Sequence, residues 1–197
     1  MFRNVSIKAR LIFMVGFLSV LLIGVGGMGI GSLSATEASL KTVYEDRVIP
    51  LGQLEHMTLL FNENQLMAAQ AVTGQLSSFP EDVATVDKQV EEIKQRMVQI
   101  DGVWKSYQAT SMTETEKQLA DALEASRMRY GREGLLPMIA ALSAHDFQQA
   151  SEILQGPMKE TYPMVRSGLD ELVKLQLDVA KAEFEAGNYQ AAGELYE

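Results

Sequence analysis

Three arginines and a tyrosine lie within six residues of the chain, and their side chains suit the binding of an anion. They are Arg127, Arg129, Tyr130 and Arg132. The planar guanidinium of an arginine can hold a carboxylate through two charge-assisted hydrogen bonds. Helical spacing places Tyr130 on the inward stripe and Arg127 at the edge of that stripe. We therefore predict that this group meets the carboxylate of a small ligand.

The same arginines also allow a purely structural interpretation. Arg127 follows Glu124 by three residues, and Arg129 precedes Glu133 by four. Such pairs on a helix surface contribute only about 0.2–0.5 kcal/mol each. Spacing alone does not tell whether the arginines are buried, so the ligand-binding and structural interpretations both stay open.

A second polar group surrounds the predicted start of a fourth helix at residue 157. Its side chains are Gln155, Lys159, Thr161 and Tyr162. The first N–H groups of a helix lack intrahelical partners and attract anions. In an antiparallel bundle this helix start lies level with the far half of the first helix, so Asn62, Asn64 or Gln65 is expected nearby. We predict that Gln155 and Thr161 orient the ligand, or that these residues only cap and cover the helix end.

The rest of the chain offers little for catalysis or metal binding. It contains no Cys, and its two histidines, His56 and His145, lie in no metal-ligand motif. It also lacks a Gly-rich phosphate loop and a Gly-x-Ser-x-Gly elbow. We therefore expect a binding protein rather than an enzyme, with no metal and no cofactor.

Helices must position these residues, because the apolar spacing is heptad-like and no segment has a strand signal. The strictest pattern alternates three- and four-residue steps from Val83 to Tyr107. Helices are expected near residues 35–76, 82–110, 114–143 and 157–197. The predicted fold is all-α, an antiparallel up-and-down four-helix bundle with an N-terminal transmembrane helix.

Local signals predict where these helices begin and where they are disturbed. Capping boxes are expected at Ser78–Glu81 and Thr113–Glu116. Pro50 is expected to bend the first helix, and Gly131–Pro137 to loosen the third. A short separate helix is expected at 146–154.

A basic leader and a long apolar run open the chain. Residues 11–33 contain no charge, and their 23 positions span roughly 34 Å as a helix, enough for the hydrocarbon core of a bilayer. Arg3, Lys8 and Arg10 precede this run, which orients residues 1–10 to the cytoplasm and sends residues 34–197 outward. A cleaved signal peptide is the alternative, although its apolar region is normally shorter.

The charge of the outward part excludes one class of partner. Three of the 17 basic residues precede residue 11 and all 26 acidic residues follow residue 35, which leaves a net charge of −12 after that point. Nucleic acid phosphates require a basic surface. We therefore expect no nucleic acid partner.

Two segments bracket the predicted membrane span: Asn-Val-Ser-Ile-Lys-Ala-Arg-Leu at residues 4–11 and Val-Tyr-Glu-Asp-Arg-Val-Ile-Pro-Leu at residues 43–51. Both resemble bacterial methyl-accepting chemotaxis receptors, and in particular the subgroup typified by the aspartate receptor. The resemblance implies a homodimeric sensor in the bacterial inner membrane. Residues 34–197 are then a periplasmic four-helix-bundle sensor domain that binds a small-molecule chemoeffector and signals across the membrane by a helix shift.

The resemblance also implies parts that this sequence does not contain. Family receptors continue into a second membrane span and a cytoplasmic coiled coil that controls a histidine kinase, so we expect the chain to be truncated within the fourth helix. Two alternatives stay open. The same sensor could be joined to a histidine kinase or cyclic-dinucleotide enzyme, or the chain could be a ligand-free structural bundle tethered to the membrane.

The ligand site departs from the aspartate-receptor pattern. In that receptor, arginines on the first helix of both subunits hold the ligand carboxylates, whereas residues 48–76 here contain no Lys or Arg. The positive charge must therefore come from elsewhere, and we expect an organic or amino acid carboxylate. Arg127→Ala and Arg129→Ala are each predicted to weaken binding about ten- to hundredfold.

Overall fold

The computed structural model describes residues 7–77 and 82–193. The chain forms two compact units, Met1–Tyr44 and Glu45–Glu197. In the first unit, helix α1 (Ile7–Val43) contains the apolar stretch Leu11–Gly31, which is long and apolar enough to cross a membrane and has a mean hydropathy of 2.4. This stretch lies inside the predicted span at residues 11–33.

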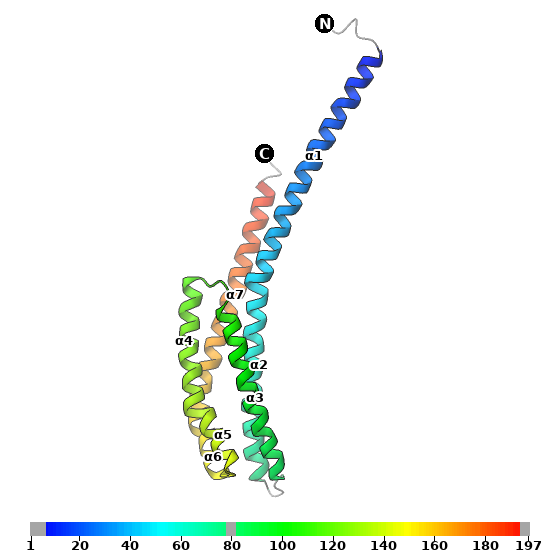
Figure 1. Ribbon diagram of the computed structural model, residues 1–197. Helices are drawn as coiled ribbons and strands as arrows, with labels where there is room; N and C mark the ends of the chain where they lie inside the picture. Colours follow the sequence, from blue (N-terminus) through cyan, green and yellow to red (C-terminus); the bar gives the residue numbers. More distant parts are fainter. Residues whose placement is uncertain (1–6, 78–81, 194–197) are drawn as a thin grey trace. The chain divides into compact units, whose positions relative to one another are not determined.

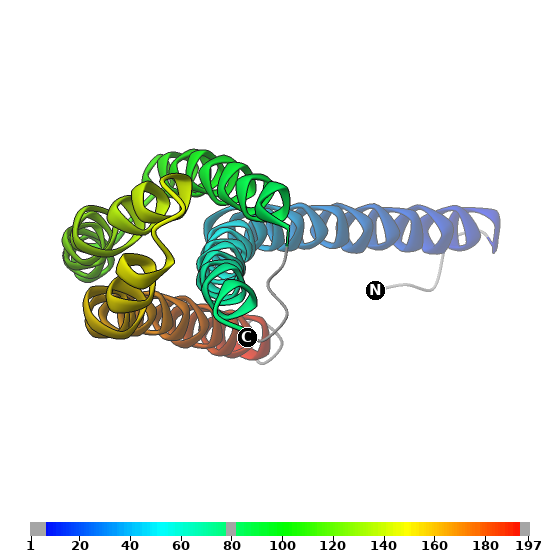
Figure 2. The same ribbon diagram turned by 90° about the horizontal axis from the view of Figure 1, so that it is seen from below.

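The second unit is an all-α antiparallel bundle, in which four helical segments surround a shared apolar interior (Figures 1 and 2). Two of these segments consist of α-helices joined by a π-helical turn, labelled η. The turn η1 (Tyr44–Val48) contains the boundary between the two units. After it come, in chain order, α2 (Ile49–Gln75), α3 (Val83–Gln108), α4 (Glu114–Tyr130), η2 (Gly131–Leu135), α5 (Leu136–Ser143), α6 (Phe147–Ile153), η3 (Leu154–Met158) and α7 (Lys159–Gly193). The predicted fold class is confirmed.

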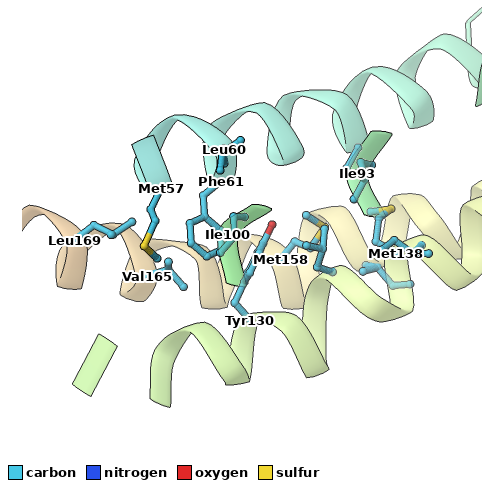
Figure 3. Packing of buried hydrophobic residues seen from close by; sticks show 14 of the residues in the cluster. Met57, Leu60, Phe61, Ile93, Ile100, Tyr130, Met138, Met158, Val165 and Leu169 are labelled. Atoms are coloured by element: carbon cyan, nitrogen blue, oxygen red, sulfur yellow. The ribbon is translucent and has the colours of Figure 1, made fainter. Parts of the chain in front are cut away.

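The core follows the apolar periodicity of the helices. In α3 the buried residues are Val86, Val90, Ile93, Ile100, Trp104 and Tyr107. These belong to the pattern predicted for this helix, although Val83 is exposed and Met97 is only half-buried. Figure 3 shows Met57 and Phe61 of α2 packed with side chains from the other segments. Burial of apolar surface, at about 25 cal/mol per Å², is the main source of stability for such a core.

Side-chain caps fix three of the helix starts. Asp82 accepts a hydrogen bond from the Ala84 N–H at 3.1 Å, Thr113 from the Glu116 N–H at 3.2 Å, and Asp146 from the Gln149 N–H at 2.9 Å. The Thr113 cap was predicted. The capping box predicted at Ser78–Glu81 lies outside the described residues.

The π-helical turns occur where prolines interrupt the α-helical pattern. Pro50 and Pro137 lie in the first turns of α2 and α5, directly after η1 and η2. A proline lacks the N–H that would bond the carbonyl four residues earlier, and its ring crowds that carbonyl. Before Pro50 this carbonyl belongs to Asp46, and the Arg47 side chain donates to it at 3.2 Å. The disturbances predicted at both prolines are confirmed.

The fourth segment corrects a prediction, because the chain does not break at Gly156 and Pro157. Both residues lie within η3, which joins α6 directly to α7. The wider π-helical turn accommodates Pro157 without ending the helix. The separate short helix and the helix start at residue 157 were therefore wrong, and the fourth segment begins at Phe147.

The two interior π-helical turns pack against each other at a glycine. A Cβ atom added to Gly134 in η2 would lie 3.0 Å from Cγ and 3.4 Å from Cα of Met158 in η3. Met158 is fully buried, so it has little room to move away. Glycine at position 134 therefore allows the third and fourth segments to approach closely beside Thr161.

Candidate ligand-binding site

Arg127 is the most enclosed of the three predicted arginines. Its side chain is 14% exposed, and it donates to Asp101 on α3 at 2.5 Å and to Glu124 on its own helix at 2.9 Å. The guanidinium carbon also lies 5.7 Å from the centre of the Trp104 ring, a cation–π arrangement. The predicted position at the edge of the inward stripe is confirmed, and the positive charge is already matched by protein carboxylates.

Arg129 and Arg132 lie on the exposed surface and share one partner. Arg129 donates to Glu133 at 2.8 Å, and Arg132 donates to the same carboxylate at 3.2 Å. These hydrogen bonds, with that from Arg129 the stronger, lower the pKa of Glu133 below its ordinary value. The Arg129 guanidinium also lies 3.8 Å from the sulfur of Met164 on α7. The partners foreseen in the structural interpretation, Glu124 and Glu133, are thus present.

Tyr130 is fully buried and lies close to Phe61 of α2 (Figure 3). Its ring centre lies 5.8 Å from Phe61 in an edge-to-face arrangement and 5.8 Å from Tyr162. Its hydroxyl has no hydrogen-bond partner among the described residues, and burial raises the pKa of this group above its ordinary value. Tyr130 and Arg127 both line a small cavity of about 50 Å³.

The second polar group brings α7 against α2, as predicted. The Tyr162 hydroxyl donates to Oδ1 of Asn62, a residue 100 positions earlier in the chain. Lys159 and Arg166 are exposed and lie one helical turn on either side of Tyr162. Burial raises the pKa of the Tyr162 hydroxyl, and the positive charge of Arg166 opposes that rise. This part of the α2–α7 face therefore combines positive charge with hydrogen-bonding groups.

The other predicted members of this group have different surroundings. Gln155 is exposed and donates to the Ser151 hydroxyl at 3.1 Å. Thr161 is buried and donates to the Pro157 carbonyl at 2.6 Å. Asn64 is fully buried, and neither polar atom of its side chain has a partner among the described residues. The structure therefore separates Gln155 on the surface from Thr161 in the interior.

One reason given for anion binding near residue 157 is wrong. The expected free N–H groups require a helix start at this point, whereas η3 continues the helix and the N–H of Lys159 bonds the Gly156 carbonyl. The segment starts instead at Phe147, where Asp146 caps it. Positive charge on this face therefore comes from side chains and not from a helix terminus.

Comparison with known proteins gives the family. The family described as "Tar ligand binding domain homologue" matches residues 1–180. The chain belongs to this family. The methyl-accepting chemotaxis protein NahY of Pseudomonas putida is 26% identical over 185 residues, which cover 93% of this chain and 33% of the relative. The chain thus spans about a third of that relative's length. No solved structure gave a significant match.

Family membership bears out the resemblance seen in the two segments that bracket the apolar run. The domain is a chemoreceptor ligand-binding domain, and such domains are sensors rather than enzymes. Residues 48–76 contain no Lys or Arg, so α2 itself contributes no cationic side chain to the bundle.

Two residues important to this region were missed from the sequence. Asp101 lies 26 residues before its partner Arg127, on a different helix, and Arg166 lies beyond the predicted group. A short turn joins the antiparallel helices α3 and α4, so counting outward from it along both helices could have indicated that Asp101 lies near Arg127. Arg166 follows Tyr162 by four residues, a spacing that places both on one face of α7.

Proposed function

We propose that this domain senses a small organic carboxylate on the periplasmic side of the bacterial inner membrane. Family membership supports the sensor class. The apolar helix Leu11–Gly31 supports anchorage in a membrane, and the basic residues before it support an outward-facing sensor. Residues 34–197 then form the periplasmic sensor domain.

The proposed ligand site is the α2–α7 face around the hydrogen bond between Tyr162 and Asn62. This proposal depends on one observation: Lys159, three residues before Tyr162, makes no ion pair with any described residue. Arg166 has only a 3.8 Å contact with Asp170, and both side chains are exposed. A ligand carboxylate can pair with Lys159 without breaking an existing interaction, with Gln155 beside it on the surface and Thr161 supporting the helix from within.

The α4 group is the alternative contact set for the same ligand. Arg127, Arg129 and Arg132 each already pair with a carboxylate of the protein. A ligand carboxylate there has to compete with Asp101, Glu124 or Glu133, and Tyr130 offers a hydroxyl that is buried below the surface. The two sites make different predictions for single alanine substitutions, so they can be separated experimentally.

We also propose that the domain works as a homodimer along α2. Leu59 and Leu66 are 54% and 59% exposed, lie seven residues apart, and face away from the core residues of α2. Gly52 and Thr73 continue the same seven-residue spacing on exposed positions. A two-stranded coiled coil repeats two apolar positions per heptad, and this stripe supplies one of them, with Leu59 and Leu66 as its apolar members. A second copy of the chain is the occupant that such a seam fits.

We propose that the signal crosses the membrane through a shift between two packings of the bundle helices. Ligand binding favours one packing and moves α7 slightly along its axis. The shift in population can be no larger than the ligand's difference in affinity for the two packings. A ligand that binds both packings equally therefore gives no signal, however tightly it binds.

Calorimetric titration of the chain in lipid nanodiscs against organic acids, amino acids and neutral analogues tests this function. We expect at least one carboxylate to bind and to raise the thermal transition, because a ligand that binds only the folded state stabilises it. Binding confined to neutral or cationic compounds would refute the carboxylate assignment. No thermal shift with any compound would instead support a ligand-free structural bundle.

A further inference from the structure

Glu116 is the one charged side chain that is buried among the described residues. It is 1% exposed, and no Lys, Arg or His of the described chain forms an ion pair with it. Arg47 is close enough for the Glu116 charge to contribute to the raised pKa of its guanidinium, but its ion-pair partner is Glu183, at 2.8 Å. A buried carboxylate without a paired cation is costly, so its remaining contacts must hold it firmly.

Two side chains from two other helices satisfy this carboxylate. Oε1 of Glu116 accepts a hydrogen bond from the Tyr107 hydroxyl of α3 at 2.8 Å and another from Nε2 of Gln176 on α7. Glu116 lies in the first turn of α4, where the helix N-terminus favours negative charge. In the expected capping box, the Glu116 carboxylate accepts a hydrogen bond from the backbone N–H of the cap residue. Here it instead links three helices in the interior of the bundle.

The contact to α7 depends on the position of that helix along its axis. A hydrogen bond weakens steeply once donor and acceptor separate beyond about 3.5 Å. Gln176 is itself 2% exposed, and its side-chain oxygen has no partner among the described residues. Water therefore cannot readily replace the bond when α7 moves, and a small axial shift leaves a buried carboxylate with one donor fewer.

We propose that Glu116 is a positioning residue that fixes the axial register of α7 through Gln176 and thereby sets the resting state of the sensor. Its signalling consequence rests on the proposed helix shift, whereas the register effect itself is independent of any ligand. Tyr107 holds the same carboxylate from α3, so it stabilises Glu116 without linking α4 to α7. This difference between the two donors allows a matched test.

The test measures the distance between α4 and α7 in the whole chain, reconstituted in nanodiscs without ligand. Spin labels are attached at Asp121→Cys and Lys181→Cys, two exposed positions in a chain that contains no native Cys. We expect Gln176→Leu to widen the distance distribution or to move its mean by about 1–2 Å. Glu116→Gln, which keeps the side-chain shape and removes the charge, changes the distribution in the same direction by less.

Two control variants separate register from general stability. Tyr107→Phe removes one hydrogen bond from the same carboxylate and is expected to leave the α4–α7 distance unchanged. Leu172→Ala removes buried apolar volume one turn from Gln176 and is expected to lower stability without the same shift. An unchanged distance in both Gln176→Leu and Glu116→Gln, or an equal change in Tyr107→Phe, would overturn the proposal. Because no ligand is present, this result is independent of the carboxylate assignment.

Discussion

The guanidinium of Arg127 lies 2.5 Å from the carboxylate of Asp101, and this ion pair links α4 to α3 beside the only tryptophan of the chain. Asp101 itself is mainly exposed, so water can solvate its carboxylate when the partner is lost. The pair therefore acts as a contact between helices at the bundle surface. Its presence shifts the expected role of Arg127 from ligand binding towards packing.

Arg127→Ala is expected to lower the free energy of unfolding by about 0.5–1 kcal/mol, because partly exposed ion pairs contribute little and some packing on Trp104 is lost. If the ligand binds at the α2–α7 face as proposed, Arg127→Ala leaves its affinity unchanged. Trp104 fluorescence reports unfolding in denaturant, with the exposed Arg132→Ala as the control. A ten- to hundredfold loss of affinity in Arg127→Ala would move the ligand site to α4.

The two buried tyrosines are expected to differ in how much stability they lose with their hydroxyl groups at neutral pH. Tyr107→Phe removes a donor from a buried carboxylate and costs about 1.5–3 kcal/mol. Tyr130→Phe removes a buried hydroxyl without a partner among the described residues and changes stability by less than about 1 kcal/mol, in either direction. Urea denaturation of both variants measures the difference. A larger cost for Tyr130→Phe would show that its hydroxyl has a partner in solution.

The same tyrosines predict a loss of stability in alkali. Burial raises the pKa of the Tyr107 and Tyr130 hydroxyls above the ordinary value of about 10. Above that pH the unfolded chain releases phenolic protons that the folded chain retains, so stability falls as pH rises, by up to about 1.4 kcal/mol per pH unit for each group. Below about pH 10 the two tyrosines give no such dependence. The Tyr130→Phe variant should show a shallower decline between pH 10 and 11, and an identical decline would contradict this assignment.

The sequence predicted the fold and the α3 core because regular apolar spacing alone defines inward faces. It also predicted the proximity of Tyr162 to α2, since an antiparallel bundle sets which segments lie level. It did not predict that η3 carries the helix through Pro157, because a π-helical turn depends on how the surrounding bundle supports it. The burial of Glu116 was missed for a similar reason. A glutamate three residues after a cap residue normally accepts a hydrogen bond from the backbone N–H of that cap residue.

The candidate site was predicted less completely than the fold. Residue types indicated where cations lie, and Arg127 was correctly placed at the edge of the core. Whether each cation is free depends on acids from other helices, such as Asp101, whose position requires the register between segments. The contrast between the paired α4 arginines and Lys159 therefore became visible only in the structure.

The exposed leucines of α2 predict how the dimer can be weakened. Leu66→Glu places a charge in the proposed seam and is expected to raise the dissociation constant of the dimer at least tenfold, because each subunit then buries a like charge. Val98→Glu on α3 is the matched control, since Val98 is 72% exposed outside the seam. Sedimentation analysis of the detergent-solubilised chain measures both variants. Equal effects of the two substitutions would rule out a dimer seam along α2.

The most direct test of the carboxylate account compares a bound acid with its neutral amide by calorimetric titration, in the unaltered chain and in Lys159→Ala. We predict that the amide binds at least about tenfold more weakly than the acid, since it cannot form the charge pair. Lys159→Ala should lower the affinity for the acid by about ten- to hundredfold and leave the affinity for the amide unchanged. Equal affinity for acid and amide, or full acid binding by Lys159→Ala, would contradict the account.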